Sequence, residues 1–351
     1  MNTRVNPPQR VQAARLWALM RRLGQLVISL FVLITLTFII GRLLPADPVG
    51  AIVGELASDE AHEAMRARLG LDQPMIVQYW RYIIQLLQGD LGIAALTGNP
   101  VIKDIALVFP ATLELATLAI FLSFCLGVPL GLAAAFFRDR WVDHLARVLS
   151  LVGSSIPIFW FGILGLLVFY AWLGWVGGPG RVDIWYEGIV PPRSGMILID
   201  SLLAGESEIF WNAFSHIILP ASLLAYASMA YLTRMTRSFT LEQLGQDYVI
   251  AARAKGASGP RLLFRHILPN IAVQLITIVA ISYGSLLEGA VVAEIVFSWP
   301  GLGQYVTNAL LIGDMNAVLA VTLVIGLTFM LLNFISDLAY TVLDPRTREV
   351  A

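Results

Sequence analysis

The chain has 351 residues, of which 58% are hydrophobic and only 13% carry a charged side chain. Soluble domains carry about 25% charged residues, so this composition excludes an ordinary soluble protein and indicates a membrane protein. The net charge of −1 favours neither a nucleic-acid partner nor a strongly charged surface.

Few residues are suited to metal binding or disulfide formation. Cys125 is the only cysteine, so no intrachain disulfide and no thiolate metal cluster is expected. The four histidines are scattered without metal-ligand spacing, and we interpret each as structural. No metal site is expected.

Six segments have the length and apolarity of membrane-spanning helices, which need about 20 apolar residues. They are expected near 25–44, 113–137, 146–173, 212–233, 271–296 and 317–343. The first span has a long apolar run and no small-x-small cleavage site after it, so we interpret it as an uncleaved anchor. The expected fold is an all-α polytopic membrane protein with six transmembrane helices.

Basic residues are distributed unevenly between alternate loops. Segments 1–24, 138–147, 234–270 and 344–351 hold 16 basic residues, whereas 45–112, 174–211 and 297–316 hold six. Because lysine and arginine concentrate in cytoplasmic loops, both termini are expected to face the cytoplasm.

The outer side is expected to carry a small helical module. Ser58 is a plausible N-cap, and a second amphipathic helix should start near Pro74 and end on Gly89. The Gly- and Pro-rich loop 174–211 should be irregular or form a hairpin. The expected parts are a cytoplasmic segment 1–24, a first span 25–44, an outer module 45–107, a transmembrane core 108–343 with a cytoplasmic loop 234–270, and a cytoplasmic tail 344–351.

Signatures of nucleotide binding and hydrolysis are missing. A P-loop requires Gly-Lys followed by Ser or Thr, but the two lysines, Lys103 and Lys255, do not follow a glycine. The G-x-S-x-G, H-E-x-x-H and C-x-x-C patterns are also missing. No enzymatic activity and no cofactor are expected in this chain.

One cytoplasmic stretch, Asp247 to Asn270, reads DYVIAARAKGASGPRLLFRHILPN and is unusually apolar for its location. On a helix, one side would carry Tyr248, Val249, Ala252 and Gly256, and the other Ile250, Ala254 and Ala257. A helix without a polar face requires burial on all sides. The transmembrane bundle can cover one side and a second protein the other, with a basic rim at Arg253, Lys255, Arg261 and Arg265. Alternatively, the helix packs only on its own chain.

The same stretch resembles the EAA loop of ABC-transporter permeases, E-A-A-x-x-x-G followed by L-P. The matching residues are Ala251, Ala252, Gly256, Leu268 and Pro269. Ile250 replaces the family's glutamate, with Asp247 three residues upstream. The form D-Y-V-x-x-A-R-A-K-G resembles the peptide-importer branch.

Five further stretches resemble the first permease of dipeptide, oligopeptide and nickel ABC importers: LGLDQPMIVQYWRYIIQLLQGDLG, FPATLELATLAI, SIPIFWFGILGLL, FSWPGLGQY and LDPRTRE. The resemblance covers about residues 24–349. It implies a type I importer permease in the bacterial inner membrane, paired with a second permease and an outer substrate-binding protein. Two partner ATPase subunits would bind ATP and Mg²⁺, one of them gripping the EAA helix. The implied coupling residues are Asp247, Tyr248, Ala251, Ala252, Arg253, Lys255, Gly256, Leu268 and Pro269.

Two further sets of residues are functional candidates. Glu288 lies inside the outer end of a span and could line the translocation path, or it could be structural. The turn containing Trp299, Pro300, Gly301 and Gly303 could contact the binding protein, or it could simply need glycine flexibility.

The competing function is a proton-coupled secondary carrier that uses intramembrane carboxylates. Such a carrier would need inverted repeats and paired broken helices, which the sequence does not show, and it leaves the apolar cytoplasmic helix unexplained. An intramembrane enzyme lacks a nucleophile and base. Whether the substrate is a peptide, a nickel complex or a sugar stays open.

Overall fold

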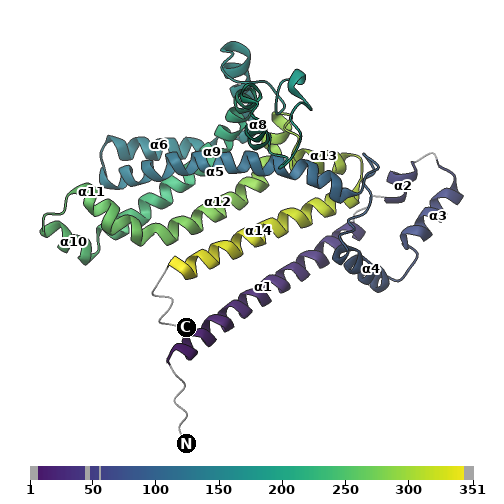
Figure 1. Cartoon of the computed structure of the whole chain (residues 1–351), viewed down its shortest axis with the longest axis horizontal. Helices are drawn as coiled ribbons and strands as arrows, with labels where there is room; N and C mark the ends of the chain where they lie inside the picture. Colours follow the sequence, from purple (N-terminus) through teal and green to yellow (C-terminus); the bar gives the residue numbers. More distant parts are fainter. Residues whose placement is uncertain (1–6, 44–47, 55–56, 344–351) are drawn as a thin grey trace, which may run out of the picture.

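The computed structural model describes residues 7–43, 48–54 and 57–343, and helices make up most of them (Figure 1). The expected cytoplasmic tail, 344–351, and the first six residues of the N-terminal segment lie outside the described residues. Within the described ranges, the only β feature is an isolated bridge between Ile93 and Pro100. The all-α fold expected from the sequence is confirmed.

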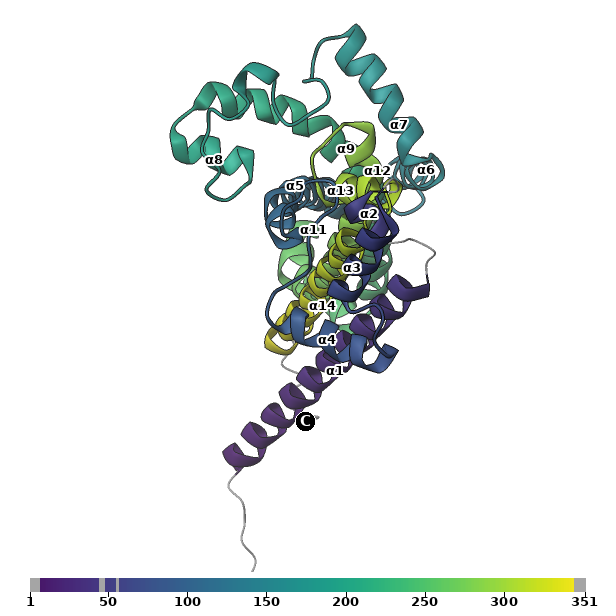
Figure 2. The ribbon, with the colours of Figure 1, turned by 90° about the vertical axis from the view of Figure 1, so that its right-hand side faces the viewer.

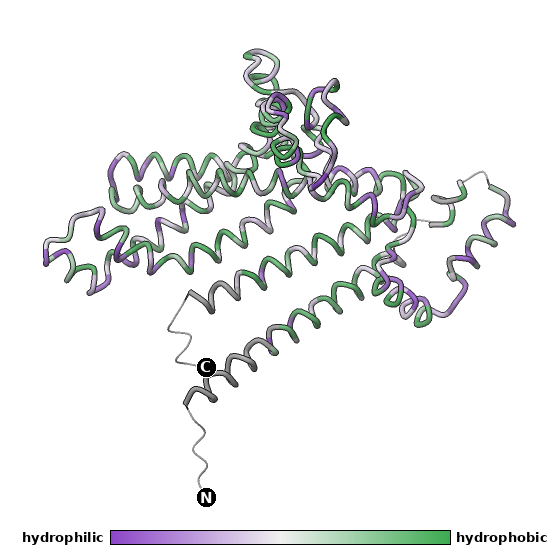
Figure 3. The backbone as a smooth tube through the Cα atoms, viewed as in Figure 1, coloured by the Kyte–Doolittle hydropathy of each residue, from purple (hydrophilic) through white to green (hydrophobic). Residues whose placement is uncertain are grey.

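Five of the described helices are long and apolar enough to cross a membrane. They are α1 (Pro7–Leu43), α5 (Val101–Phe136), α9 (Ser207–Leu244), α12 (Leu268–Val296) and α14 (Met315–Leu343). Each overlaps one expected span. Figure 3 shows hydrophobic residues along the middle of α12 and α14, with hydrophilic residues gathered on α3 and near α10.

The expected continuous span 146–173 is instead a bent pair of helices. The chain runs through α6 (Trp141–Ser155), α7 (Ile158–Gly165) and the π-helix η1 (Leu166–Trp172), with a bend of 99° between the two halves. Pro157 explains the break, because a residue before proline avoids the helical region. Ile156 is accordingly extended, with φ −88° and ψ 128°. The pair makes a sixth span if both halves count as one.

The centre of the bundle is the contact between α5 and α9, which run side by side. Two glycines of α5 allow this contact. A Cβ on Gly131 would lie 2.7 Å from the Thr233 carbonyl oxygen, and one on Gly127 would lie 3.1 Å from the Met229 carbonyl oxygen. The Thr233 hydroxyl also donates to the Gly127 carbonyl at 3.2 Å.

The helical module that follows α1 and the short helices α10 (Asp247–Ala254) and α11 (Gly259–Leu262) lie at opposite ends of the molecule (Figure 1). The module consists of α2 (Pro48–Val53), α3 (Asp59–Leu69) and α4 (Met75–Leu87). Ser58 caps α3 as expected, because its hydroxyl accepts the Ala61 N–H at 3.3 Å. Helix α5 begins at Val101, inside the region assigned to the module.

The loop 174–211 contains no hairpin. It holds a 3-10 turn, η2 (Ile184–Tyr186), and α8 (Ile197–Ala204) before α9 begins. Helices α7 and α8 project from the bundle on the side away from α1 (Figure 2). A last short helix, α13 (Leu302–Leu311), leads into α14.

Candidate functional site

The segment from Asp247 to Asn270, here called the coupling segment, lies at the end of the bundle opposite the outer module (Figure 1). It forms α10 (Asp247–Ala254), α11 (Gly259–Leu262) and the π-helix η3 (Leu263–Ile267), which leads into α12. Helix α9 ends at Leu244, well inside the loop expected at 234–270.

Local chemistry explains where α10 begins and ends. Asp247 lies in its first turn, where a carboxylate is favourable. At its end Gly256 has φ +80°, and the Gly256 and Ala257 N–H groups donate to the Arg253 and Ala252 carbonyls. These two bonds form a Schellman motif, which needs a left-handed residue at this position. A Cβ on Gly256 would meet nothing within 4 Å, so conformation rather than close packing requires this glycine within the chain.

One side of α10 packs on the chain itself. Val249 is fully buried in a cluster with Leu232, Leu262, Ile267 and Ile271. Ala252 packs against the same cluster. The expected burial of Val249 and Ala252 on one side of the helix is therefore observed.

The other side of α10 is bare. Ile250 is 56% exposed, and Ala251 and Ala254 are also exposed. Tyr248 and Gly256, which helical spacing puts on the same side as Val249, are exposed as well, whereas Ala257, assigned to the opposite side, is half-buried. These differences from the helical projection arise at the start of α10 and beyond its end, where the helical period of 3.6 residues no longer sets which side a residue faces.

Phe264 was not singled out in the sequence, yet it is 68% exposed in η3, directly after α11. Its position in the sequence, between Leu263 and Arg265 in a loop with many basic residues, was the signal that could have identified it as a candidate contact residue. The π-helix that carries it precedes Pro269, which lacks an N–H donor and crowds the carbonyl four residues back. Leu268 is half-buried and Pro269 exposed, at the start of α12.

The four basic residues expected at the rim, Arg253, Lys255, Arg261 and Arg265, are exposed. None of them forms an ion pair with another described residue. They are therefore open to acidic groups of another chain.

Hydrogen bonds of the Tyr248 hydroxyl hold the two ends of the coupling segment together. Its hydroxyl donates to Gln243 Oε1 at 2.6 Å and accepts from Asn270 Nδ2 at 3.2 Å. The bonds connect the last turn of α9 to the start of α12 across the coupling segment.

A buried carboxylate ties α6 to α9 just before the coupling segment. Asp143 is fully buried. It accepts hydrogen bonds from Arg237 Nε and the second Arg237 nitrogen at 2.7 and 2.8 Å, and from Arg147 at 2.5 Å. The contact with Arg147 is local, at i,i+4, but sequence spacing could not reveal Arg237, which lies 94 positions from Asp143.

Replacing Arg237 by methionine is expected to lower the free energy of unfolding by about 1–3 kcal/mol, because the buried Asp143 loses two charged donors. Denaturant unfolding of the purified protein in mild detergent would measure this. The matched control is Arg138→Met, whose ion pair with Asp139 is exposed on both sides and should change stability by less than about 0.5 kcal/mol. Equal effects of the two substitutions would contradict the assignment.

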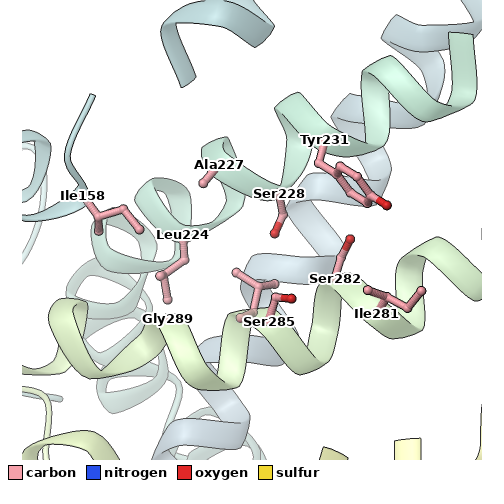
Figure 4. Close-up of a pocket in the computed structure, with 10 residues that line it drawn as sticks. Ile158, Leu224, Ala227, Ser228, Tyr231, Ile281, Ser282, Ser285 and Gly289 are labelled. Carbon is pink, nitrogen blue, oxygen red and sulfur yellow. The ribbon is translucent and has the colours of Figure 1, made fainter. Parts of the chain in front are cut away.

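A groove opens between α9 and α12 near the middle of both helices (Figure 4). Its volume is about 290 Å³. Its polar atoms are the hydroxyls of Ser228 and Tyr231 on α9 and of Ser282 and Ser285 on α12, and no charged residue lines it. The sequence reasoning missed these hydroxyls, since serines in an apolar helix carry no distinctive pattern.

Glu288 does not line this groove. It is exposed on α12, three residues from Ser285 and next to Gly289, which both line the groove. Helical spacing puts Glu288 at its edge. Its part in a translocation path stays a prediction.

The turn after α12 is held together by buried hydrogen bonds. Glu294, fully buried, accepts from the Gly303 and Gln304 N–H groups at 2.6 and 3.0 Å and from the Thr112 hydroxyl at 2.6 Å. A Cβ on Gly303 would lie 2.4 Å from Val291 Cα. The carboxylate thus caps α13 and joins it to α5 and α12.

This packing limits which residues of the turn a partner can touch. Trp299 is fully buried and donates its indole N–H to the Ala111 carbonyl at 2.9 Å. Gly301 and Gly303 are buried as well, and Pro300 is exposed. A binding-protein contact at this turn stays a prediction, and within the chain only Pro300 of the four is available for it.

Two further carboxylates hold the outer loop. Arg181 donates to Glu114 at 2.7 Å and lies over the Trp299 ring. Asp200 accepts the N–H groups of Ser194 and Gly195 at 2.8 and 3.0 Å. Burial opposes ionisation of Asp200, but these hydrogen bonds outweigh it and lower its pKa.

The spans and the polar helical ends define an all-α integral membrane protein. Residues 127–349 match the family described as "Binding-protein-dependent transport system inner membrane component", and residues 15–116 match the N-terminal region of such membrane components. The chain belongs to this family of inner-membrane transport permeases, which makes it a transport subunit.

Curated relatives agree with this assignment. The chain is 41% identical over 333 residues to the probable D,D-dipeptide transport system permease protein DdpB of Escherichia coli K12, covering 94% of this chain and 97% of the relative. It is 40% identical to the di/tripeptide transport system permease protein DppB of Pseudomonas aeruginosa UCBPP-PA14, covering 94% and 98%. A structure of the MetNI methionine ABC transporter shares 18% identity with TM-score 0.49, covering 67% of this chain and 93% of that one. A likeness this weak adds nothing to the family assignment.

Proposed function

We propose that this chain forms half of the membrane pathway of an ATP-driven importer for dipeptides and short oligopeptides. The dipeptide names of relatives that are about 40% identical across nearly the whole chain support the substrate class. The second half of the pathway would come from a similar permease, and a substrate-binding protein would deliver peptide from outside.

The surface of the coupling segment is the observation that supports two partner ATPase subunits as the source of energy for transport. It presents exposed apolar side chains, Ile250 and Phe264, and a rim of basic residues without ion pairs, in a loop whose basic residues predict a cytoplasmic location. Exposed apolar surface with a polar rim is typical of a protein contact. Ile250 stands at the position of the family's glutamate, so the contact here is apolar.

In the proposed cycle, this chain binds no ATP or Mg²⁺ and performs no covalent chemistry. ATP binding by the partner ATPases draws the coupling segments of both permeases together. The bundles then rock and open the pathway outward to receive peptide, and hydrolysis resets them. Both termini and the coupling segment would face the cytoplasm, in accordance with the distribution of basic residues.

The test is reconstitution of the complete importer in vesicles. We expect uptake of radiolabelled L,L-dialanine that requires ATP, the binding protein, both permeases and the ATPases. The purified permease alone should hydrolyse no ATP. Uptake driven by a proton gradient without the ATPases would instead support a secondary carrier.

A further inference from the structure

The groove between α9 and α12 contains four hydroxyls without hydrogen-bond partners among the described residues. Ser282 is only 4% exposed, and its hydroxyl oxygen is buried without a partner. Figure 4 shows the hydroxyls of Ser228, Ser282 and Tyr231 directed into the space between the two helices. Several other helical serines bond to a carbonyl three or four residues back, as Ser201 does to Leu198 and Ser123 to Ala119.

The position of the groove makes unpaired hydroxyls costly. Its hydroxyl residues lie near the middle of α9 and α12, and on α12 the groove reaches Gly289, next to Glu288. No lipid group at that depth offers a hydrogen bond, and a buried polar group without a partner is unfavourable. The buried Ser282 hydroxyl therefore needs a partner from outside the chain, and the half-buried Ser228 and Tyr231 and the exposed Ser285 are open to the same partner.

We propose that this groove binds the main-chain amides of a passing peptide through Ser228, Tyr231, Ser282 and Ser285. The inference rests on the proposed peptide-import function and specifies how the path recognises its substrate. A hydroxyl both donates and accepts, so a pair of hydroxyls matches the N–H and C=O of one peptide bond. The recognition is independent of the side chain.

Charge and size favour this occupant. A charged ligand would need a counter-charge in an apolar environment, and no charged residue lines the groove. Its volume of about 290 Å³ is at the small end of ligand pockets, enough for one peptide unit with its flanking carbons. Only the neutral amide unit would occupy the groove. The charged amino and carboxylate ends of the peptide would both lie beyond it, and exposed Glu288 stands on α12 at the edge, where it can pair with the amino group.

The first experiment measures uptake in the complete reconstituted importer. The double substitution Ser282→Ala and Ser285→Ala is expected to lower the ratio of dialanine uptake to ATP hydrolysed about tenfold. The reduction should be the same for L,L-dialanine and D,D-dialanine, because both present the same amide. The control is Thr277→Val, since the Thr277 hydroxyl on the same helix already bonds to the Val273 carbonyl.

Unchanged uptake per ATP in the double variant would overturn the proposal. So would an equal loss in Thr277→Val, or a loss confined to one stereoisomer. ATP hydrolysis and the yield of assembled complex are measured in parallel, so that a folding defect is recognised.

The second experiment measures access and remains informative if the double variant assembles poorly. In a Cys125→Ala background, which removes the one exposed native thiol, Ser285→Cys in the assembled importer should react with N-ethylmaleimide. Saturating dialanine should slow the reaction at least fivefold. A cysteine that does not react shows that the second permease covers the groove, and one that reacts without protection shows a water-filled path only; either result overturns the proposal.

Failure of this inference can be told apart from failure of the proposed function. If the wild-type importer takes up no dialanine under ATP, the substrate class or the function is wrong. If the wild type transports and the groove variants behave as the wild type does, only the groove assignment is wrong.

Discussion

Replacing both Ile250 and Phe264 by aspartate is expected to abolish ATPase binding and ATP-driven uptake while leaving the fold of the permease intact. Both side chains are mostly exposed and bury little apolar surface within the chain. In a complex each would contribute about 1.5–3 kcal/mol on full burial, and a buried unpaired carboxylate costs more. Affinity for the ATPase should fall at least a hundredfold, measured by co-purification and by titration of ATPase against permease in nanodiscs.

The matched control adds the same charge beside and within the coupling segment and leaves Ile250 and Phe264 unchanged. Gln246 and Ser258 are exposed N-cap residues of α10 and α11, positions where aspartate is favourable. The Gln246→Asp, Ser258→Asp variant should retain most of the binding. Equal loss in both variants would show that charge in this loop, and not the apolar face, determines the contact.

Gly256 is a poor position for this test, although the family pattern points to it. Its φ of +80° means that any side chain adds about 1–2 kcal/mol of backbone strain. A substitution there would disturb the end of α10 itself. Loss of ATPase binding could then be attributed to the helix rather than to its surface.

Replacing Glu294 by leucine is expected to destabilise the permease by about 3 kcal/mol or more. The fully buried carboxylate accepts three hydrogen bonds, and each donor left unpaired costs about 1–3 kcal/mol. Helix α13 would lose its cap, and its attachment to α5 and α12 would weaken. Denaturant unfolding in mild detergent and the yield of folded protein would report the loss.

Glu288→Leu is the control, because Glu288 lies on the same helix and is exposed. Its effect on stability should be within about 0.5 kcal/mol. If Glu294→Leu is equally mild, the hydrogen bonds of the turn contribute little to stability and the role assigned to Glu294 is wrong.

Hydropathy and loop composition were sufficient for the membrane class, the approximate spans and the coupling helix with one packed side. These features depend on residues close together in the chain. A run of about 20 apolar residues must cross the bilayer wherever it packs, and the cap at Ser58 depends on a residue three positions away. The bend at Pro157 also depends on neighbouring residues, but the chain is apolar on both sides of this proline, so hydropathy predicted one continuous span.

The buried polar contacts could not be found in this way. The sequence suggested Trp299 as a contact for a partner, but its indole is buried and donates to the Ala111 carbonyl, 188 positions away. Asp143 and Glu294 likewise accept hydrogen bonds from residues distant in the chain. Hydropathy assigns an acid in a span the same value whether it caps a helix or lines a translocation path.

Local patterns thus indicated which stretches are long and apolar enough to cross the membrane, and which helix packs with one side on the chain itself. Only the tertiary structure showed which acids form buried hydrogen bonds within the chain and that Phe264 is exposed. The packing of α9 against α12 also brings four hydroxyls into one groove. The reason is physical: hydropathy and helical period are properties of neighbouring residues, whereas burial and hydrogen bonding are properties of side chains that meet only after folding.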